Sequence, residues 1–121
     1  MIQKKREEGA LVLTVLRSFM ADRGTETFEA AYRPLVATEK KLVMDLSELD
    51  YIDSSHLATL VVFYKRVVQS GGNVVFTGLR HTVRDALQVT RLDKVFVLAA
   101  STKDALELLE NLPPNEVATG H

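Results

Sequence analysis

Two kinds of hydrophobic run alternate along this chain. Short aliphatic runs without helical spacing are typical of buried strands, and they occur as ALVLTVLR (10–17), KLVMDL (41–46), NVVFTG (73–78) and KVFVLA (94–99). Between them lie longer segments whose apolar residues recur every three or four positions. That spacing places apolar side chains on one face of a helix.

Four helices are predicted in these longer segments. They lie in TETFEAAYRPLVA (25–37), in a long segment from about Ser55 to Gln69, in HTVRDALQVT (81–90) with Val83, Ala86, Leu87 and Val89 inward, and in STKDALELLENL (101–112). Thr25 and Ser101 are the expected N-caps of the first and last. Pro34 should kink the first helix or end it early.

Strands that alternate with helices of this length predict an α/β fold. We expect a mixed, mostly parallel sheet of about four to five strands packed by about four helices. The length of 121 residues fits one domain, with residues 113–121 after the last helix as a flexible tail.

Composition narrows the range of functions. The chain is 46% hydrophobic and 26% charged, as in a globular protein, and its net charge of −1 gives no attraction to nucleic acid or to an anionic membrane. It has no cysteine, no apolar stretch that could span a bilayer and no nucleotide-binding loop. His56, His81 and His121 lack metal-ligand spacing. We therefore expect a cytoplasmic protein with no cofactor and no enzymatic activity.

YIDSSHL (51–57) marks an abrupt change from strand-like to helix-like sequence. On the simplest interpretation, Asp53 or Ser54 is only the N-cap of the long helix, because a short side-chain oxygen accepts hydrogen bonds from free helix N–H groups. The same helix end is also a favourable place for a phosphate. The loop follows the carboxyl end of a strand, where open α/β sheets place their functional sites.

The segment LVMDLSELDYIDSSHLATLVVFYKRVVQSGGNVVFTGL (42–79) resembles the sulphate-transporter and anti-sigma-factor-antagonist (STAS) domain. Family members show an apolar strand, an acidic turn, a D-S-[ST]-G-L motif that opens a long helix, and then GG and a further strand. VRDALQVTRLDKVFVLAASTKDAL (83–106) is similar to the family's later elements, and the resemblance covers roughly residues 11–109.

The resemblance implies an anti-sigma factor antagonist that acts by partner switching. In such proteins the first serine after the aspartate is phosphorylated, which here is Ser54; Asp53 and Ser55 would be partner-binding neighbours. The implied partners are an anti-sigma factor that is also a serine kinase of the GHKL type, and a serine phosphatase. We expect a monomer or a weak homodimer, without nucleic acid and without membrane insertion.

This chain departs from the family pattern in two places. His56 replaces the usual glycine, so it is either a solvated helix residue or a residue that tunes partner choice. The family's early G-x-L-D turn is replaced by RSFMADRGT (17–25), where Asp22 is the nearest acidic candidate for partner binding.

Two other functions remain open on the sequence alone. The chain could be a stand-alone cytoplasmic subunit of a transport or signalling complex, such as a lipid ABC transporter, in which the serine is only a cap or a contact. It could also be a small-ligand sensor that uses the same loop.

Overall fold

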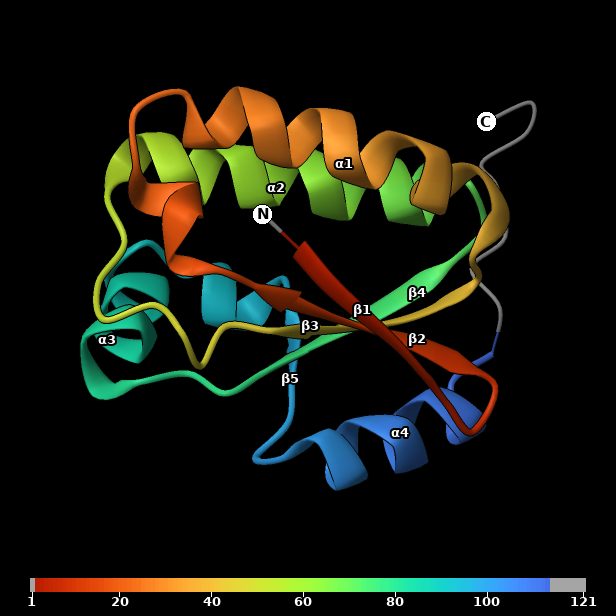
Figure 1. The fold of residues 1–121 in the computed structure, drawn as a ribbon. Helices are drawn as coiled ribbons and strands as arrows, with labels where there is room; N and C mark the ends of the chain where they lie inside the picture. Colours follow the sequence, from red (N-terminus) through yellow and green to blue (C-terminus); the bar gives the residue numbers. More distant parts are fainter. Residues whose placement is uncertain (1, 114–121) are drawn as a thin grey trace.

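The computed structural model describes residues 2–113 and has eleven elements of secondary structure (Figure 1). In chain order they are β1 (Ile2–Glu7), β2 (Ala10–Val15), the 3₁₀ helix η1 (Arg17–Met20), α1 (Gly24–Thr38), β3 (Lys41–Asp45), α2 (Ser54–Gln69), β4 (Asn73–Thr77), α3 (His81–Val89), the 3₁₀ helix η2 (Leu92–Lys94), β5 (Val97–Leu98) and α4 (Thr102–Asn111).

The five strands form one mixed sheet in the order β1-β2-β3-β4-β5. Only β1 runs antiparallel to its neighbour; β2, β3, β4 and β5 pair in parallel. A two-residue turn joins β1 to β2, and both of its residues have positive φ: 49° at Glu8 and 80° at Gly9. Such a turn matches the twist of two antiparallel strands, and glycine adopts this conformation without strain.

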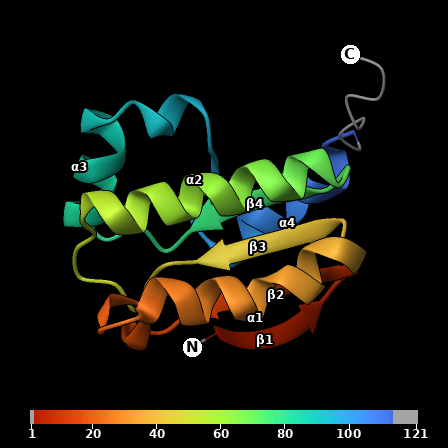
Figure 2. The same ribbon diagram turned by 90° about the horizontal axis from the view of Figure 1, so that it is seen from above.

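The sheet has a helix layer on each face. Helices α1 and α2 lie side by side over one face, and α4 covers the other (Figures 1 and 2). Within β3, Leu42 and Met44 pack under α1 and α2, whereas Val43 packs against α4. This alternation is the expected consequence of burying both faces of one strand.

The structure confirms the predicted α/β fold, with a mixed, mostly parallel sheet and four α-helices. It adds β1, a strand with mostly exposed side chains that has little hydrophobic signal. It also shortens the last predicted strand to two residues, Val97 and Leu98.

Three details of the expected helices were wrong. Helix α1 starts at Gly24 after Arg23 in a left-handed conformation, so Thr25 is not its N-cap. Of the two outcomes expected at Pro34, the early end is wrong, because α1 continues to Thr38, whereas the kink stays a prediction. Val89 is 84% exposed, because it lies on the outer side of the last turn of α3. The cap at Ser101 is confirmed, since its hydroxyl accepts the Asp104 N–H.

Two further expectations concern the C-terminal tail and the membrane. Apart from Pro113, the tail expected at 113–121 lies outside the described residues. Within residues 2–113, no helix has both the length and the apolar character needed to cross a bilayer.

Stability should depend on the buried side chains of β3. Leu42 is fully buried, and Leu42→Ala should lower the free energy of unfolding by about 2–5 kcal/mol, because it removes apolar contacts and leaves a cavity. Urea unfolding measures this. Lys41→Ala, at the exposed neighbouring position, is the control and should stay within about 0.5 kcal/mol of wild type. Similar midpoints for the two variants would contradict the assignment of the core.

Candidate functional site

The loop from β3 to α2 begins with a fixed turn. Oδ1 of Asp45 accepts the backbone N–H of Ser47 at 2.9 Å, which turns the chain directly after the strand. The neighbouring loop packs closely on this turn: a Cβ at Gly78 would lie 2.3 Å from Asp45 Oδ1. Gly78 also has a φ of 73°. Glycine is therefore required there by both space and conformation.

Arg80 fastens the middle of the same loop. Its Nε donates to the carbonyl of Ser47 at 2.8 Å, and its guanidinium also donates to the carboxylate of Asp50 at 2.7 Å. Thr82 donates to the carbonyl of Asp50. Arg80 thus joins the β4–α3 connection to the loop that leads to α2.

Asp53 is the N-cap of α2. One of its oxygens, Oδ1, accepts three donors: the backbone N–H of His56 at 3.0 Å, the hydroxyl of Ser55 at 2.7 Å and Nδ1 of the His56 ring at 2.5 Å. The backbone N–H contributes most to holding the pKa of Asp53 well below its usual value, followed by the Ser55 hydroxyl and the His56 ring. The carboxylate is thus fixed in position and ionised, while its side chain is 54% exposed.

The two serines after Asp53 differ in their environment. Both are exposed in the first turn of α2, but the hydroxyl of Ser55 is engaged with Asp53. Among the described residues, none forms a hydrogen bond with the hydroxyl of Ser54. Of the two hydroxyls, that of Ser54 is therefore the one presented without a competing contact.

His56 is buried, with only 8% of its surface exposed, so of the two alternatives for this residue the solvated helix position is wrong. Its Nε2 lies 3.0 Å from the carbonyl oxygen of Phe19 in η1, and its ring packs edge-on against the Phe19 ring with centroids 4.7 Å apart. The sequence held a signal for this burial: His56 precedes Leu60, Phe63 and Val67 at spacings of four, three and four, in line with the buried stripe of α2. By contrast, nothing in the sequence pattern indicates that the Phe19 carbonyl lies beside the His56 ring.

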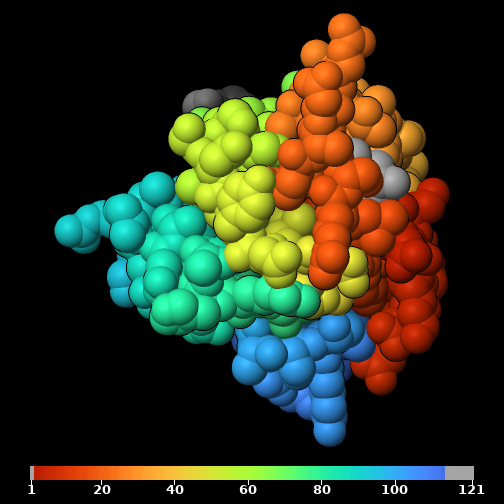
Figure 3. Space-filling view, turned by 60° about the vertical axis from the view of Figure 1, so that its left-hand side comes forward, coloured from red at the N-terminus to blue at the C-terminus, as the bar shows by residue number. Residues whose placement is uncertain are grey.

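Asp22 lies apart from the hydrogen-bonded group of Asp53, Ser55 and His56. It is exposed in the turn between η1 and α1, and within residues 2–113 no hydrogen bond or ion pair joins it to the start of α2. The two segments nevertheless share a face of the molecule, where the orange η1–α1 segment lies against the yellow β3–α2 loop (Figure 3). Arg17 and Glu48 approach to 3.9 Å across this boundary.

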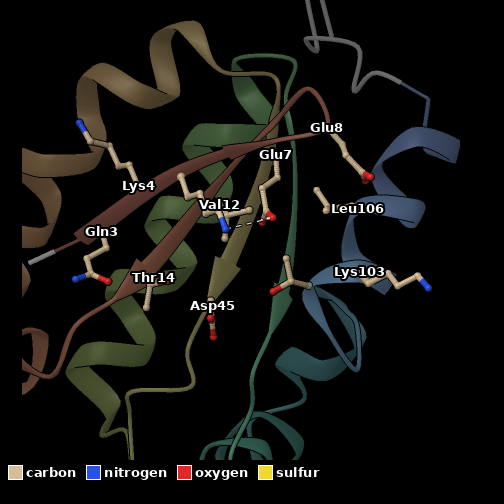
Figure 4. A pocket seen from close by; sticks show the side chains of 11 residues that line it. Gln3, Lys4, Glu7, Glu8, Val12, Thr14, Asp45, Lys103 and Leu106 are labelled. Atoms are coloured by element: carbon tan, nitrogen blue, oxygen red, sulfur yellow. Dashed lines mark ion pairs between the residues drawn. The ribbon is translucent and has the colours of Figure 1, made fainter.

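The largest of the surface pockets described here lies away from the start of α2. The junction of η1 and the β3–α2 loop holds a hollow of only about 120 Å³. A groove of about 1010 Å³ lies on the other face of the sheet, between the β1–β2 hairpin and α4 (Figure 4). Lys5 and Glu7 form an ion pair of 3.6 Å along it, and Asp45 lies at its edge. None of the residues from Asp53 to His56 lines this groove.

The fold and the site together define a class of protein: an α/β domain that presents an exposed serine and a fixed carboxylate at one helix start, on a surface without a deep pocket. The STAS domain model matches residues 1–105, and the chain belongs to the STAS family.

Named relatives and solved structures agree with this assignment. The chain is 26% identical to BtrV of Bordetella bronchiseptica, named as a candidate anti-sigma factor antagonist, over 86% of this chain and 90% of BtrV. A STAS domain protein of Planctomyces limnophilus matches with a TM-score of 0.79 and 20% identity, covering 90% of this chain and 97% of that one.

The anti-sigma factor antagonist SpoIIAA, a Bacillus cell fate determinant, has been solved unphosphorylated and phosphorylated. The unphosphorylated form matches with a TM-score of 0.73 and 14% identity, over 93% of this chain and 99% of SpoIIAA. At these identities, the structural likeness supports the fold.

The lowered pKa of Asp53 predicts how the stability of the fold changes as the pH falls. A carboxyl group with a lower pKa in the folded state stabilises the fold above its unfolded pKa, about 3.9, and this contribution is lost as the pH falls below that value. Asp53→Asn should therefore lower the melting temperature at pH 7, and the gap to wild type should narrow as the pH falls from about 4 toward 2. Thermal melts across this range measure the gap.

Asp22→Asn controls for the loss of one exposed carboxylate. A gap for Asp53→Asn that stays constant over the whole range would contradict a stabilising role of the ionised Asp53.

Proposed function

We propose that this protein is an anti-sigma factor antagonist whose binding to its partner is controlled by phosphorylation of Ser54. The observation that carries the proposal is the pairing of an exposed, unengaged Ser54 hydroxyl with a fixed, ionised Asp53 beside it. Phosphorylation adds about 1.5 to 2 negative charges at pH 7. The new charge would lie beside a carboxylate that three hydrogen bonds hold in place.

The charge added at Ser54 should act on binding and not on folding. The start of a helix has free N–H groups and a partial positive charge, so it tolerates a phosphate. In a close protein interface, however, two adjacent negative groups repel each other and lose their hydration. Partner switching follows: the unmodified protein binds the anti-sigma factor, the kinase activity of that partner adds the phosphate and breaks the complex, and a serine phosphatase restores the binding form.

Known relatives support this function. BtrV is named as a candidate anti-sigma factor antagonist, and SpoIIAA exists in a phosphorylated form. A transport-complex subunit is less well supported, because these named relatives are antagonists. For a ligand sensor built on the same loop, the hollow beside that loop is too small for all but a very small molecule.

Ser54 is expected to be the phosphorylated residue. Its hydroxyl is free to approach a γ-phosphate, whereas the Ser55 hydroxyl would first have to leave Asp53. The protein should be used to capture its partner from native lysate, incubated with that partner and ATP, and digested for mass spectrometry. Phosphate is expected at Ser54 in wild type and at neither serine in Ser54→Ala. Phosphate on Ser55 alone, or no phosphate with a kinase shown to be active, would contradict the assignment.

Partner affinity and fold stability are expected to respond separately at Ser54. Ser54→Ala should hold the partner in the presence of ATP, because no phosphate can be added. Ser54→Glu should weaken binding, while its neutral counterpart Ser54→Gln should not. A carboxylate carries about half the charge of a phosphate, so the loss for Ser54→Glu is partial. Calorimetric titration measures the affinity, and thermal melts of the same samples should differ little.

The effect of Ser54→Glu should also shrink at high salt, since screening acts over about 10 Å at 0.1 M ionic strength. Equal partner affinity for Ser54→Glu and Ser54→Ala, with only stability altered, would reduce Ser54 to a structural residue of the helix start.

A further inference from the structure

His56 links two segments that are far apart in the sequence. One ring nitrogen, Nδ1, faces Oδ1 of Asp53 at 2.5 Å, and the other, Nε2, faces the carbonyl oxygen of Phe19 at 3.0 Å. Both nitrogens therefore point at acceptors. A neutral imidazole has one N–H and can donate to only one of them at a time, whereas an imidazolium donates to both.

The Phe19 carbonyl lies at the point where η1 passes into α1. It is packed so closely on the start of α1 that a Cβ at Gly24 would lie 2.1 Å from it. The segment between them is held by short-range bonds, from Ala21 N–H to the Ser18 carbonyl at 3.0 Å and from Gly24 N–H to the Ala21 carbonyl at 2.9 Å. A displacement of the Phe19 carbonyl must therefore move this turn.

The other ring nitrogen of His56, Nδ1, contacts the Asp53 carboxylate, which a charge at Ser54 would affect directly. Asp53 directly precedes Ser54, and the Oδ1 atom that receives the ring nitrogen also receives the Ser55 hydroxyl. A negative charge added at position 54 repels this carboxylate and attracts any proton-bearing imidazole. The added charge therefore acts directly on the contact between Asp53 and His56.

We propose that His56 is a positioning residue that joins the η1–α1 turn to the start of α2, so that a charge at Ser54 is transmitted to residues Phe19–Gly24. The partner surface then spans both segments, and Asp22 in the η1–α1 turn belongs to it. This inference deepens the proposed function and rests on it for the identity of Ser54 as the modified residue. The physical coupling can be measured without any partner.

The first experiment uses amide hydrogen exchange to separate the two contacts of His56, one with Asp53 and one with the Phe19 carbonyl. His56→Gln places an amide nitrogen near the position of Nε2 and should keep the bond to Phe19. His56→Asn reaches only toward Asp53 and should lose it. Exchange at Ala21 and Gly24 should rise about five- to tenfold in His56→Asn, as for the loss of one hydrogen bond, and stay near wild type in His56→Gln.

Amides in the central strands serve as the reference for this experiment. Val43 and Val75 report opening of the core, so each change at Ala21 and Gly24 is compared with the change at these two residues. If His56 only fills space, the turn and the core should change together in both variants. Equal exchange at the turn in His56→Asn and His56→Gln would overturn the anchoring role.

The second experiment tests transmission of charge by NMR. Ser54→Glu and the neutral Ser54→Gln should differ in the amide chemical shifts of residues 19–24, and a protein with phosphoserine incorporated at position 54 should show a larger difference from wild type. In the His56→Gln background, which lacks the donor to Asp53, the difference between Glu and Gln at position 54 should vanish.

Two results would overturn the inference: no shift difference at residues 19–24 in the His56 protein, or a difference of the same size in the His56→Gln background. Neither depends on a kinase. A failure of this coupling is therefore distinct from a failure of phosphorylation at Ser54, which mass spectrometry tests separately.

Discussion

Three donors converge on one oxygen of Asp53, and the arrangement of the site depends on that convergence. The backbone N–H fixes where α2 begins, the Ser55 hydroxyl is engaged with the carboxylate, and the ring of His56 is held inward. The second oxygen of the carboxylate receives no donor among the described residues, so it remains available on the exposed side. One side chain thus sets both the start of the helix and which groups a partner meets.

This convergence is possible because the loop before it has little freedom. Leu46, Leu49 and Ile52 are buried, so three positions of the β3–α2 loop are held by the core. Polar contacts from Arg80 and Thr82 hold the residues between them. Exposed ion pairs contribute little stability one by one, so these contacts matter mainly for where the loop lies. The hydrophobic core provides the stability, and the polar contacts provide the geometry of the site.

The sequence predicted those features that depend on local pattern. The buried middle of β3, residues 42–44, is entirely apolar, and the capping serine of α4 lies where its side chain reaches a free N–H. Strand β1 was missed because an edge strand with exposed side chains needs only backbone bonds to β2, and IQKKRE carries no alternating apolar signal. The short β5 was overestimated for the opposite reason: the side chains of residues 96–99 pack on the core, while only Val97 and Leu98 pair with β4.

In the candidate site too, only the features that depend on local sequence pattern could be predicted. Asp53 and Ser54 could be recognised because capping and exposure follow from position in the first turn of a helix. The partner of Nε2 in His56 could not, because a backbone carbonyl 37 residues away leaves no trace in the pattern of residue types.

The inward position of His56 also bears on the difference from the usual STAS motif. Where glycine is typical of the family, a larger side chain would be expected to obstruct a partner that approaches the start of α2. Here the His56 side chain is only 10% exposed and lies against Phe19, so the outer surface at position 56 is almost free of side-chain atoms, as it would be with glycine. The backbone near Ser54 can therefore still be approached closely. The difference from glycine lies beneath the surface, where the histidine ring contacts Phe19 of η1 and a glycine would make no side-chain contact.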